Sequence, residues 1–302
     1  MSMDSPPKQR ALAAAAAALH AEWSAALGTP RPGIDGAGRV MDWVAHRAGE
    51  LGRALADGSL STEEHNDQRF AMTLALRRFI DAGVDEPTAR LMSRAMYDLV
   101  VDSPALPHPR YRFTYDWASQ HTGAWRRELA HLAAQPAVRG LEVGCFEGQS
   151  ACWWLENVLT HPTSALTCVD QFGTPMGSIY LNYYERHFDH NVAASGAGHR
   201  VTKLIGLSQV VLRTLPPSSF HFAYVDASHR VGDVLQDAVL VWGLLQPGGI
   251  AIFDDYDLVE DAALGLQARA PRLALDPFVA ILGSSAEVLR RDWQLVLRKL
   301  AR

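Results

Sequence analysis

Five short apolar runs follow Arg110, and turn residues end each of them. The runs cover 139–143, 165–169, 201–205, 221–225 and 249–253. Helical stretches separate them, over 149–160, 182–194, 207–214 and 231–245. Strands that alternate with helices in this way form a parallel sheet, because each return to the sheet needs a crossover, and the helices then cover both faces. The sequence therefore predicts a doubly wound α/β domain.

The last two apolar runs, 286–290 and 293–299, follow a helical stretch near 272–282. They are too close in sequence for a crossover, so we expect them to pair as an antiparallel hairpin. Together with the five preceding runs they predict a mostly parallel sheet of seven strands. A parallel sheet that ends in such a hairpin is one particular variant of the doubly wound, Rossmann-like fold.

The first part of the chain is expected to be helical, over 7–27, 38–57, 62–82 and 86–101. Ser61 and Glu64 fit a capping box at the start of the third helix. A stiff linker then follows, formed by Pro104, Pro107 and Pro109. We therefore expect an N-terminal helical region over 1–105 and an α/β domain over 111–302. The helical region is expected to act as a lid or an oligomerisation element, or else as a packing extension without chemistry.

The charge balance argues against a nucleic-acid partner. The chain has 28 Lys and Arg against 33 Asp and Glu, a formal net charge of −5, whereas phosphate contacts need a basic face. The lysines are Lys8, Lys203 and Lys299, and no Gly-Lys-Ser/Thr run occurs. A P-loop is therefore excluded.

The composition also favours a cytoplasmic protein. Nothing approaches the run of about 18 apolar residues that a membrane helix needs, so no membrane partner is expected. The alanine run 13–18 imitates a signal peptide, but it continues into His20 and Glu22, which favours a helix instead. The cysteines are odd in number and lack CxxC spacing, so we expect buried thiols at Cys145, Cys152 and Cys168.

A glycine-rich segment, residues 140–148, leaves the first predicted strand and enters the next helix. Its glycines let a ligand approach the backbone where helix N–H groups are unpaired. The dinucleotide fingerprint GxGxxG is absent, and Glu142 is a poor neighbour for a pyrophosphate. An acid there suits the ammonium group of an amino acid, and Asp170, at the end of the second strand, can accept both hydroxyls of a ribose. A ligand with a ribose and an ammonium group, and no diphosphate, is S-adenosylmethionine.

The pattern E-x-G-x-x-x-G, followed by an acid at the end of the second strand, resembles class I S-adenosylmethionine-dependent methyltransferases. The resemblance covers about residues 111–302. It includes Leu-Gln-Pro-Gly-Gly at 245–249, which is similar to the L-x-P-G-G turn before the family's fifth strand. The segments 224–229 and 253–256 are most similar to the branch that contains macrolide-sugar and cephamycin-type O-methyltransferases.

The resemblance implies a set of cofactor contacts from the loops that follow the strands. These residues are Trp117, Glu142, Gly144, Phe146, Gly148, Asp170, Gln171, Ser208 and Asp226. Within the set, Glu142, Gly144 and Gly148 are expected to line the methionine part. Asp170 is expected to bind the ribose, and Ser208 the adenine side. The segment 113–117 resembles one that closes over the cofactor, which also makes His121 a candidate pocket residue.

Three carboxylates are predicted at the ends of neighbouring strands, Asp226 after the fourth and Asp254 and Asp255 after the fifth. Converging carboxylates repel unless a cation joins them, and oxygen ligands suit Mg²⁺. Members of the branch that the chain resembles hold a divalent metal at matching positions. His229, in the same loop as Asp226, is expected to act as the base. The alternatives are acids that cap a helix and a histidine that only contacts the cofactor.

The sequence therefore predicts an S-adenosylmethionine-dependent methyltransferase that acts on the hydroxyl of a small molecule. Its catalytic residues would be Asp226 and His229. The alternative is metal-free S-methylation of a thioether amino acid such as methionine, because a thioether has no proton to lose. A decayed cofactor-binding protein or an NAD-type oxidoreductase also stays open, but the complete acidic motifs and the missing GxGxxG argue against them. The apolar surface of the N-terminal helices leads us to expect a homo-oligomer, namely a dimer.

Overall fold

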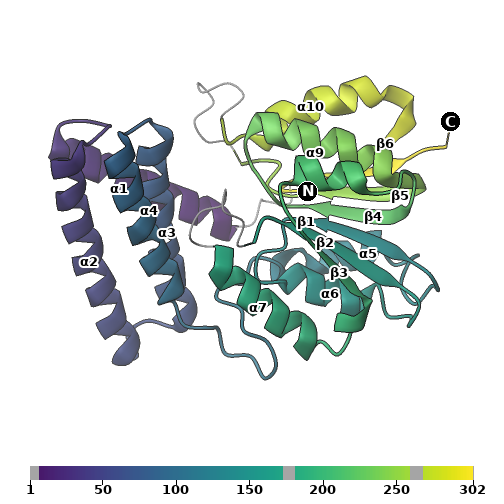
Figure 1. The fold of residues 1–302 in the computed structure, drawn as a ribbon, viewed down its shortest axis with the longest axis horizontal. Helices are drawn as coiled ribbons and strands as arrows, with labels where there is room; N and C mark the ends of the chain where they lie inside the picture. The colour runs from purple at the N-terminus through teal and green to yellow at the C-terminus, as the bar shows by residue number, and fades with distance from the viewer. Residues whose placement is uncertain (1–6, 173–180, 259–267, 302) are drawn as a thin grey trace. The chain divides into compact units, whose positions relative to one another are not determined.

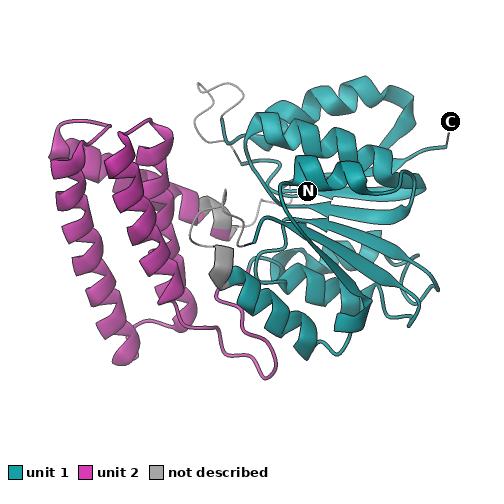
Figure 2. Cartoon of the chain, in the orientation of Figure 1, with its two compact units in different colours: residues 1–5, 117–174, 184–302 teal, residues 6–116, 175–183 magenta. Residues whose placement is uncertain are grey.

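The computed structural model describes residues 7–172, 181–258 and 268–301. The chain divides into two compact units (Figure 2). The helical unit comprises residues 6–116 and 175–183, and the sheet unit comprises residues 1–5, 117–174 and 184–302. Every residue of the predicted cofactor and catalytic sites belongs to the sheet unit.

The helical unit is built from long helices, which are α1 (Pro7–Leu27), α2 (Ile34–Ala56), α3 (Thr62–Asp81) and α4 (Glu86–Val101). The predicted capping box is present: the Ser61 hydroxyl accepts a bond from the Glu64 N–H, and the Glu64 carboxylate accepts one from the Ser61 N–H at 2.9 Å. The predicted start of α2 at residue 38 was wrong. The helix begins at Ile34, because burial of Ala37 in its first turn outweighs the weak helix propensity of the neighbouring glycines.

Buried polar side chains of α3 hold the segment that follows α4. The Asn66 amide donates to the carbonyls of Pro104, at 2.8 Å, and Thr114, at 2.7 Å. Arg69 Nε donates to the Leu99 carbonyl at 2.7 Å. The bonds of Asn66 satisfy carbonyl groups of the proline-rich segment that lie outside any helix or sheet, and the bond of Arg69 satisfies a carbonyl group in the last turn of α4.

The sheet unit contains a seven-stranded sheet with the order β3-β2-β1-β4-β5-β7-β6 (Figure 1). The strands are β1 (Arg139–Val143), β2 (Ala165–Asp170), β3 (Val201–Ile205), β4 (Phe220–Val225), β5 (Leu245–Phe253), β6 (Ala286–Arg291) and β7 (Leu295–Lys299). Strands β1 to β5 pair in parallel, and β7 pairs antiparallel with both β5 and β6. The predicted doubly wound, mostly parallel sheet and its closing hairpin are therefore confirmed.

Helices cover both faces of this sheet (Figure 1). One face packs against α5 (Thr122–Glu128), α6 (Gln149–Asn157) and α7 (Leu181–Ala194), and the other against α8 (Ser208–Val211), α9 (Val231–Leu244) and α10 (Pro271–Leu282). Because strand side chains alternate between faces, Leu141 of β1 enters the core under α9, whereas Glu142 lies on the face that α6 covers. Phe222 and Tyr224 of β4 share the face of Glu142 and contact Trp154 of α6.

No helix among the described residues is long and apolar enough to cross a membrane. The cysteines Cys145, Cys152 and Cys168 are buried and form no disulfide bond, as the sequence predicts. Cys145 and Cys168 pack as small apolar side chains in the core on the α6 side of the sheet, and Cys152 lies in α6 itself.

Candidate active site

The parallel register aligns the carboxyl ends of β2, β1, β4 and β5. Backbone hydrogen bonds continue the ladder one residue beyond β1, β4 and β5. The residues at that level are, in order across the sheet, Asp170, Gly144, Asp226 and Asp254. Ligands of open α/β sheets bind at this edge, so the fold places the predicted site residues where a ligand is expected.

Gly144 brings the ends of β1 and β4 into backbone contact. Its φ angle is +83°, and a Cβ atom built there would lie 1.9 Å from the carbonyl oxygen of Asp226. Gly148, with a φ of +80°, precedes α6 as its N-cap, and a Cβ there would lie 3.0 Å from the Phe188 ring. A side chain at Gly144 would therefore push the two strand ends apart, which explains why the motif needs glycine at this position.

The Asp170 carboxylate orders the glycine-rich loop. Its Oδ2 accepts from the backbone N–H groups of Cys145, at 2.7 Å, and Phe146, at 3.1 Å, and its Oδ1 accepts from that of Phe172, at 3.2 Å. An ionised carboxylate has about four acceptor sites, so one remains for a ligand such as a ribose hydroxyl. Gln171, the next residue, is half-buried.

Glu142 is a fully buried acid directly below Gly144 on the strand. Its Oε1 accepts from the Ser150 hydroxyl, whereas its Oε2 has no hydrogen-bond partner among the described residues. Burial raises the pKa of Glu142 to about 8, and the nearby Asp226 and Asp170 add to the effect. A buried carboxyl group with a free oxygen is costly unless a ligand engages it, and a cationic group would engage it best.

An aromatic stack includes the glycine-rich loop. The Phe146 ring, held at a φ of +46°, stacks on Trp117 at 5.2 Å and contacts Tyr184 of α7 at 4.0 Å between ring centroids. The backbone N–H groups of Trp117 and Ala118 both donate to Gln149 Oε1 at 3.1 Å. The structure therefore brings the predicted cofactor residues Trp117 and Phe146 together.

Asp226, His229 and Asp255 form a second cluster, in which potential ligand atoms lie within 4.8 Å of one another. Burial, together with the charges of Asp254 and Asp255, raises the pKa of Asp226 to about 6. His229 opposes this effect. The pKa of Asp255 is lowered overall. Burial would raise it, but the interaction with His229 outweighs the effect of burial. This half-buried group of two carboxylates and one imidazole is a plausible donor set for a divalent cation.

Contacts on both ring nitrogens determine the protonation of His229. Nε2 lies 2.8 Å from Asp255 Oδ2 and 3.5 Å from Asp226 Oδ1, while Nδ1 lies 3.0 Å from Arg269 Nη2. Burial lowers the pKa of His229, but the two carboxylates outweigh burial and Arg269 and raise it to about 9. A guanidinium can only donate, so Nδ1 accepts from Arg269 and the ring proton lies on Nε2, which faces the two carboxylates.

Asp254 is less accessible than its neighbours, with 8% of its side chain exposed. Its Oδ2 accepts from the Tyr224 hydroxyl and its Oδ1 from the Asp255 N–H at 2.8 Å. The buried His121 places Nε2 3.9 Å from Oδ1. Asp254 thus lies beside the cluster of Asp226, His229 and Asp255 rather than within it.

Sequence reasoning missed Tyr224 and Arg269 as parts of this site. A signal existed for Tyr224, because a residue two positions before Asp226 on a strand shares its face. Arg269 lies 40 residues from His229 in the sequence, and no local pattern links the two.

Ser208 begins α8, after β3, and is half-buried. It interacts with the buried Asp237 of α9, whose pKa burial raises to about 6 against the opposing effect of Ser208. The structure therefore places Ser208 beyond the end of β3, as expected for a residue on the adenine side, and connects it to α9.

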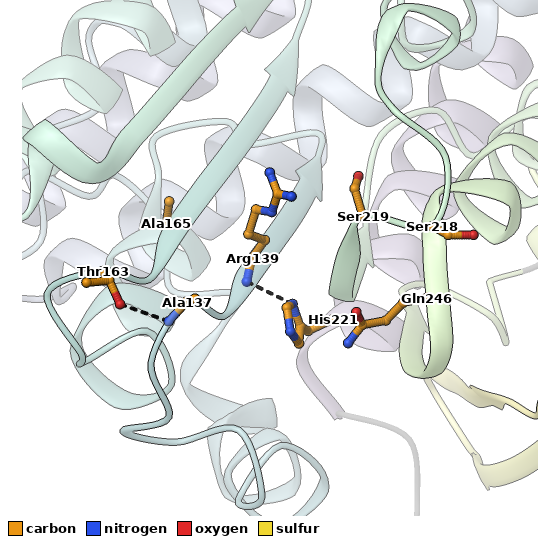
Figure 3. Close-up of a pocket in the computed structure, with 8 residues that line it drawn as sticks. All are labelled: Ala137, Arg139, Thr163, Ala165, Ser218, Ser219, His221 and Gln246. Carbon is orange, nitrogen blue, oxygen red and sulfur yellow. Dashed lines mark hydrogen bonds between the residues drawn. The ribbon is translucent and has the colours of Figure 1, made fainter.

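A separate cavity of about 530 Å³ opens at the amino ends of the strands, opposite the edge that carries the acids (Figure 3). His221 Nδ1 accepts there from the backbone N–H of Arg139 at 3.0 Å. The lining residues are Ala137, Arg139, Thr163, Ala165, Ser218, Ser219, His221 and Gln246. None of the predicted site residues lines this cavity.

Comparison with known proteins adds a family match. A family model described as a methyltransferase domain matches residues 141–256. Similar solved structures include a protein from Corynebacterium glutamicum, with 18% identity, coverage of 75% of this chain and 96% of that chain, and a TM-score of 0.47. Another is the O-methyltransferase TomG from Streptomyces achromogenes in complex with SAM. It has 16% identity, coverage of 70% of this chain and 86% of that chain, and a TM-score of 0.46. A search of curated proteins finds no match.

The matched segment begins within β1 and ends after Asp255, so it contains both halves of the candidate site. Residues 141–256 thus match a methyltransferase domain, and the mostly parallel seven-stranded sheet agrees with the predicted Rossmann-like class I fold. The enzyme class that the sequence predicts is therefore confirmed.

Gly144→Ala should disrupt cofactor binding. The added Cβ clashes with the Asp226 carbonyl, so the ends of β1 and β4 must separate. Gly196→Ala is the matched control, because Gly196 has a φ of +75° but nothing lies within 4 Å of its Cβ position. The control should lose only the cost of a left-handed alanine, roughly 1–2 kcal/mol. Chemical unfolding and calorimetric titration with S-adenosylmethionine measure both effects, and equal losses in the two variants would contradict the role of the close contact.

Glu142 should make the protein less stable as the pH rises from about 4.5 to about 8. Its folded pKa lies above the ordinary value of 4.5, so the folded state keeps a proton that the unfolded state has lost. The contribution of Glu142 to stability is fully present below the unfolded pKa of 4.5. It is lost as the pH rises to the folded pKa of about 8. Glu142→Gln should flatten the profile by up to about 1.4 kcal/mol per pH unit within that window. Parallel stability curves for the two proteins would refute the raised pKa.

Proposed function

We propose that the enzyme transfers the methyl group of S-adenosylmethionine to a hydroxyl group of a small molecule, assisted by a divalent cation, Mg²⁺ in the first instance. The observation that carries this proposal is the pair of separate acidic groups along one sheet edge. Asp170 and Glu142 lie on the β1–β2 side, and Asp226 and Asp255 lie on the β4–β5 side. One group suits a ribose and an ammonium ion, and the other suits a metal ion.

The residues of the β1–β2 side fit S-adenosylmethionine. The free Oε2 of Glu142 would bind the ammonium group, and the remaining acceptor site of Asp170 would bind a ribose hydroxyl. Gly144 and Gly148 leave room for the ligand against the backbone, with Phe146 and Trp117 beside it. Gln171 and Ser208 would complete the site on the ribose and adenine sides.

The residues of the β4–β5 side fit a cation. Asp226 and Asp255 point at the same histidine, and the pKa of Asp226 is raised by burial and by its acidic neighbours, which a cation would offset. We assign Asp226 and Asp255 as its direct protein ligands. Asp254, the third predicted ligand, lies beside them, is linked to Asp226 through the Tyr224 hydroxyl, and would complete the site. If the His229 nitrogen were itself a ligand, Mn²⁺ or Zn²⁺ would suit the site better than Mg²⁺.

His229 would then be the base. Asp255 and Asp226 are the groups that raise its pKa, so compensation of their charge lowers it toward the neutral range where a histidine accepts protons. A divalent cation would supply that charge and favour the ionised form of the acceptor hydroxyl. Because Arg269 can only donate to Nδ1, Nε2 would become free to accept a proton once Arg269 turns away and the ring proton moves to Nδ1.

The remaining task of the protein is alignment. When bound, S-adenosylmethionine would supply a methyl group on a positively charged sulfur, for displacement by the acceptor oxygen with loss of the carbon–sulfur bond. His229 would take the proton that the hydroxyl loses. Phe146, Trp117 and the buried strand ends would exclude water and fix the reactants in line.

The helical region, residues 1–105, is proposed to form a lid or the interface of a homo-oligomer. The exposed apolar side chains of this region include Ile34 and Trp43 of α2, with 50% and 42% of their surface exposed, on opposite faces of the helix. The net charge of −5 supports a small-molecule substrate rather than a nucleic acid. We propose that the enzyme works in the cytoplasm.

Removal of divalent cations should abolish turnover. The reaction would be followed as release of S-adenosylhomocysteine with a panel of hydroxylated metabolites, and mass analysis would identify the methylated product. EDTA should stop the reaction, and Mg²⁺ should restore it. His229→Ala should lower the rate roughly a hundred- to ten-thousandfold with little change in cofactor affinity. The matched control is His199→Ala, because His199 is exposed and lies outside the site.

The opposite outcome would favour the alternative reaction. Full activity in EDTA, together with a small effect of His229→Ala, would indicate metal-free methylation of a thioether, in which alignment alone drives the displacement. The carboxylates of Asp226 and Asp255 would then bind the ammonium group of an amino-acid substrate.

A further inference from the structure

Tyr224 joins the two strands that carry the acidic site. It lies two residues before Asp226 on β4, opposite Ile252 of β5, so its side chain shares a sheet face with Asp226 and Asp254. Its hydroxyl donates to Asp254 Oδ2 and lies 3.2 Å from Asp226 Oδ2. One phenol group therefore contacts a carboxylate from each strand.

The surroundings of Tyr224 fix this hydroxyl in place. The residue is 3% exposed, and its ring packs edge-on against Trp125 at 5.3 Å and tilted against Trp154 at 5.6 Å between centroids. A phenol is neutral at ordinary pH, so this hydroxyl carries a proton that it can donate. The aromatic packing gives the hydroxyl little freedom to turn elsewhere.

Two carboxylates at adjacent strand ends repel each other, and a neutral donor between them reduces the cost. Asp254 is also held by the Asp255 N–H at 2.8 Å. Without the phenol, Asp226 and Asp254 would lose the group that links their carboxylates, and Asp254 would keep the bond from the Asp255 N–H and the ion pair with His121. The spacing of the acids at the ends of β4 and β5 therefore depends on Tyr224.

We infer that Tyr224 is a positioning residue that sets the spacing of Asp226 and Asp254 for cation binding. This inference rests on the proposed function, because it concerns the same carboxylates. Tyr224 acts through them and needs no contact with the cofactor or with the acceptor.

Tyr224→Phe tests the inference, because it keeps the ring and removes the hydroxyl. Calorimetric titration with Mg²⁺ alone should show an affinity lowered roughly ten- to a hundredfold, which is typical when a group that orients metal ligands is lost. Affinity for S-adenosylhomocysteine should not change. Tyr256→Phe is the matched control: Tyr256 is also buried, and its hydroxyl donates to Asp276 at 2.6 Å, away from the acidic site. The control should bind Mg²⁺ like the wild type.

Asp254→Asn provides a second variant that leaves the aromatic packing intact. If Tyr224 acts through Asp254, the double variant should bind Mg²⁺ little worse than Asp254→Asn alone, whereas independent effects would add. Wild-type Mg²⁺ affinity in Tyr224→Phe, or additive losses in the double variant, would overturn this inference and leave the proposed function standing. Failure of the wild-type protein to bind Mg²⁺ would overturn both.

Discussion

The contact between Gly144 and the backbone of Asp226 is the constraint on which the candidate site depends. A Cβ atom at residue 144 would lie 1.9 Å from the Asp226 carbonyl oxygen, so only glycine lets β1 and β4 end at the same level. At that level Asp170, Gly144, Asp226 and Asp254 form a row across the sheet, with Asp170 at one end and Asp254 at the other. The β1–β2 half of the row can then hold a cofactor, and the β4–β5 half can hold the groups that activate an acceptor.

Much of the fold could be predicted from the sequence, because strand and helix periodicity are local signals. The parallel order and the closing hairpin follow from the lengths of the connections between apolar runs. The start of α2 could not be predicted, because burial of Ala37 overrides the weak propensity of the glycines beside it, and burial is a tertiary effect. The carboxyl ends of parallel strands meet at one edge, so the position of Glu142, Asp170 and Asp226 in one site could be predicted as well.

The directions in which the side chains of the candidate site point could not be predicted from the sequence. Asp254 and Asp255 are adjacent in sequence, yet one accepts a hydrogen bond from Tyr224 and the other pairs with His229. The chain turns at Asp255, which has a φ of +53°, and nothing in the residue type announces that angle. The contact of Arg269 with His229 Nδ1 is likewise long-range, and it opposes the two carboxylates, which raise the pKa of the histidine.

The division of the row into two halves is the central claim, and one set of calorimetric titrations with S-adenosylmethionine tests it most directly. Asp170→Ala removes an acid from the cofactor half, and Asp255→Asn removes a charge from the other half. Loss of a charged hydrogen bond costs roughly 1.5–3 kcal/mol, so Asp170→Ala should weaken cofactor binding about ten- to a hundredfold, whereas Asp255→Asn should leave it unchanged. Unchanged affinity in Asp170→Ala with a large loss in Asp255→Asn would contradict the assignment of the two halves.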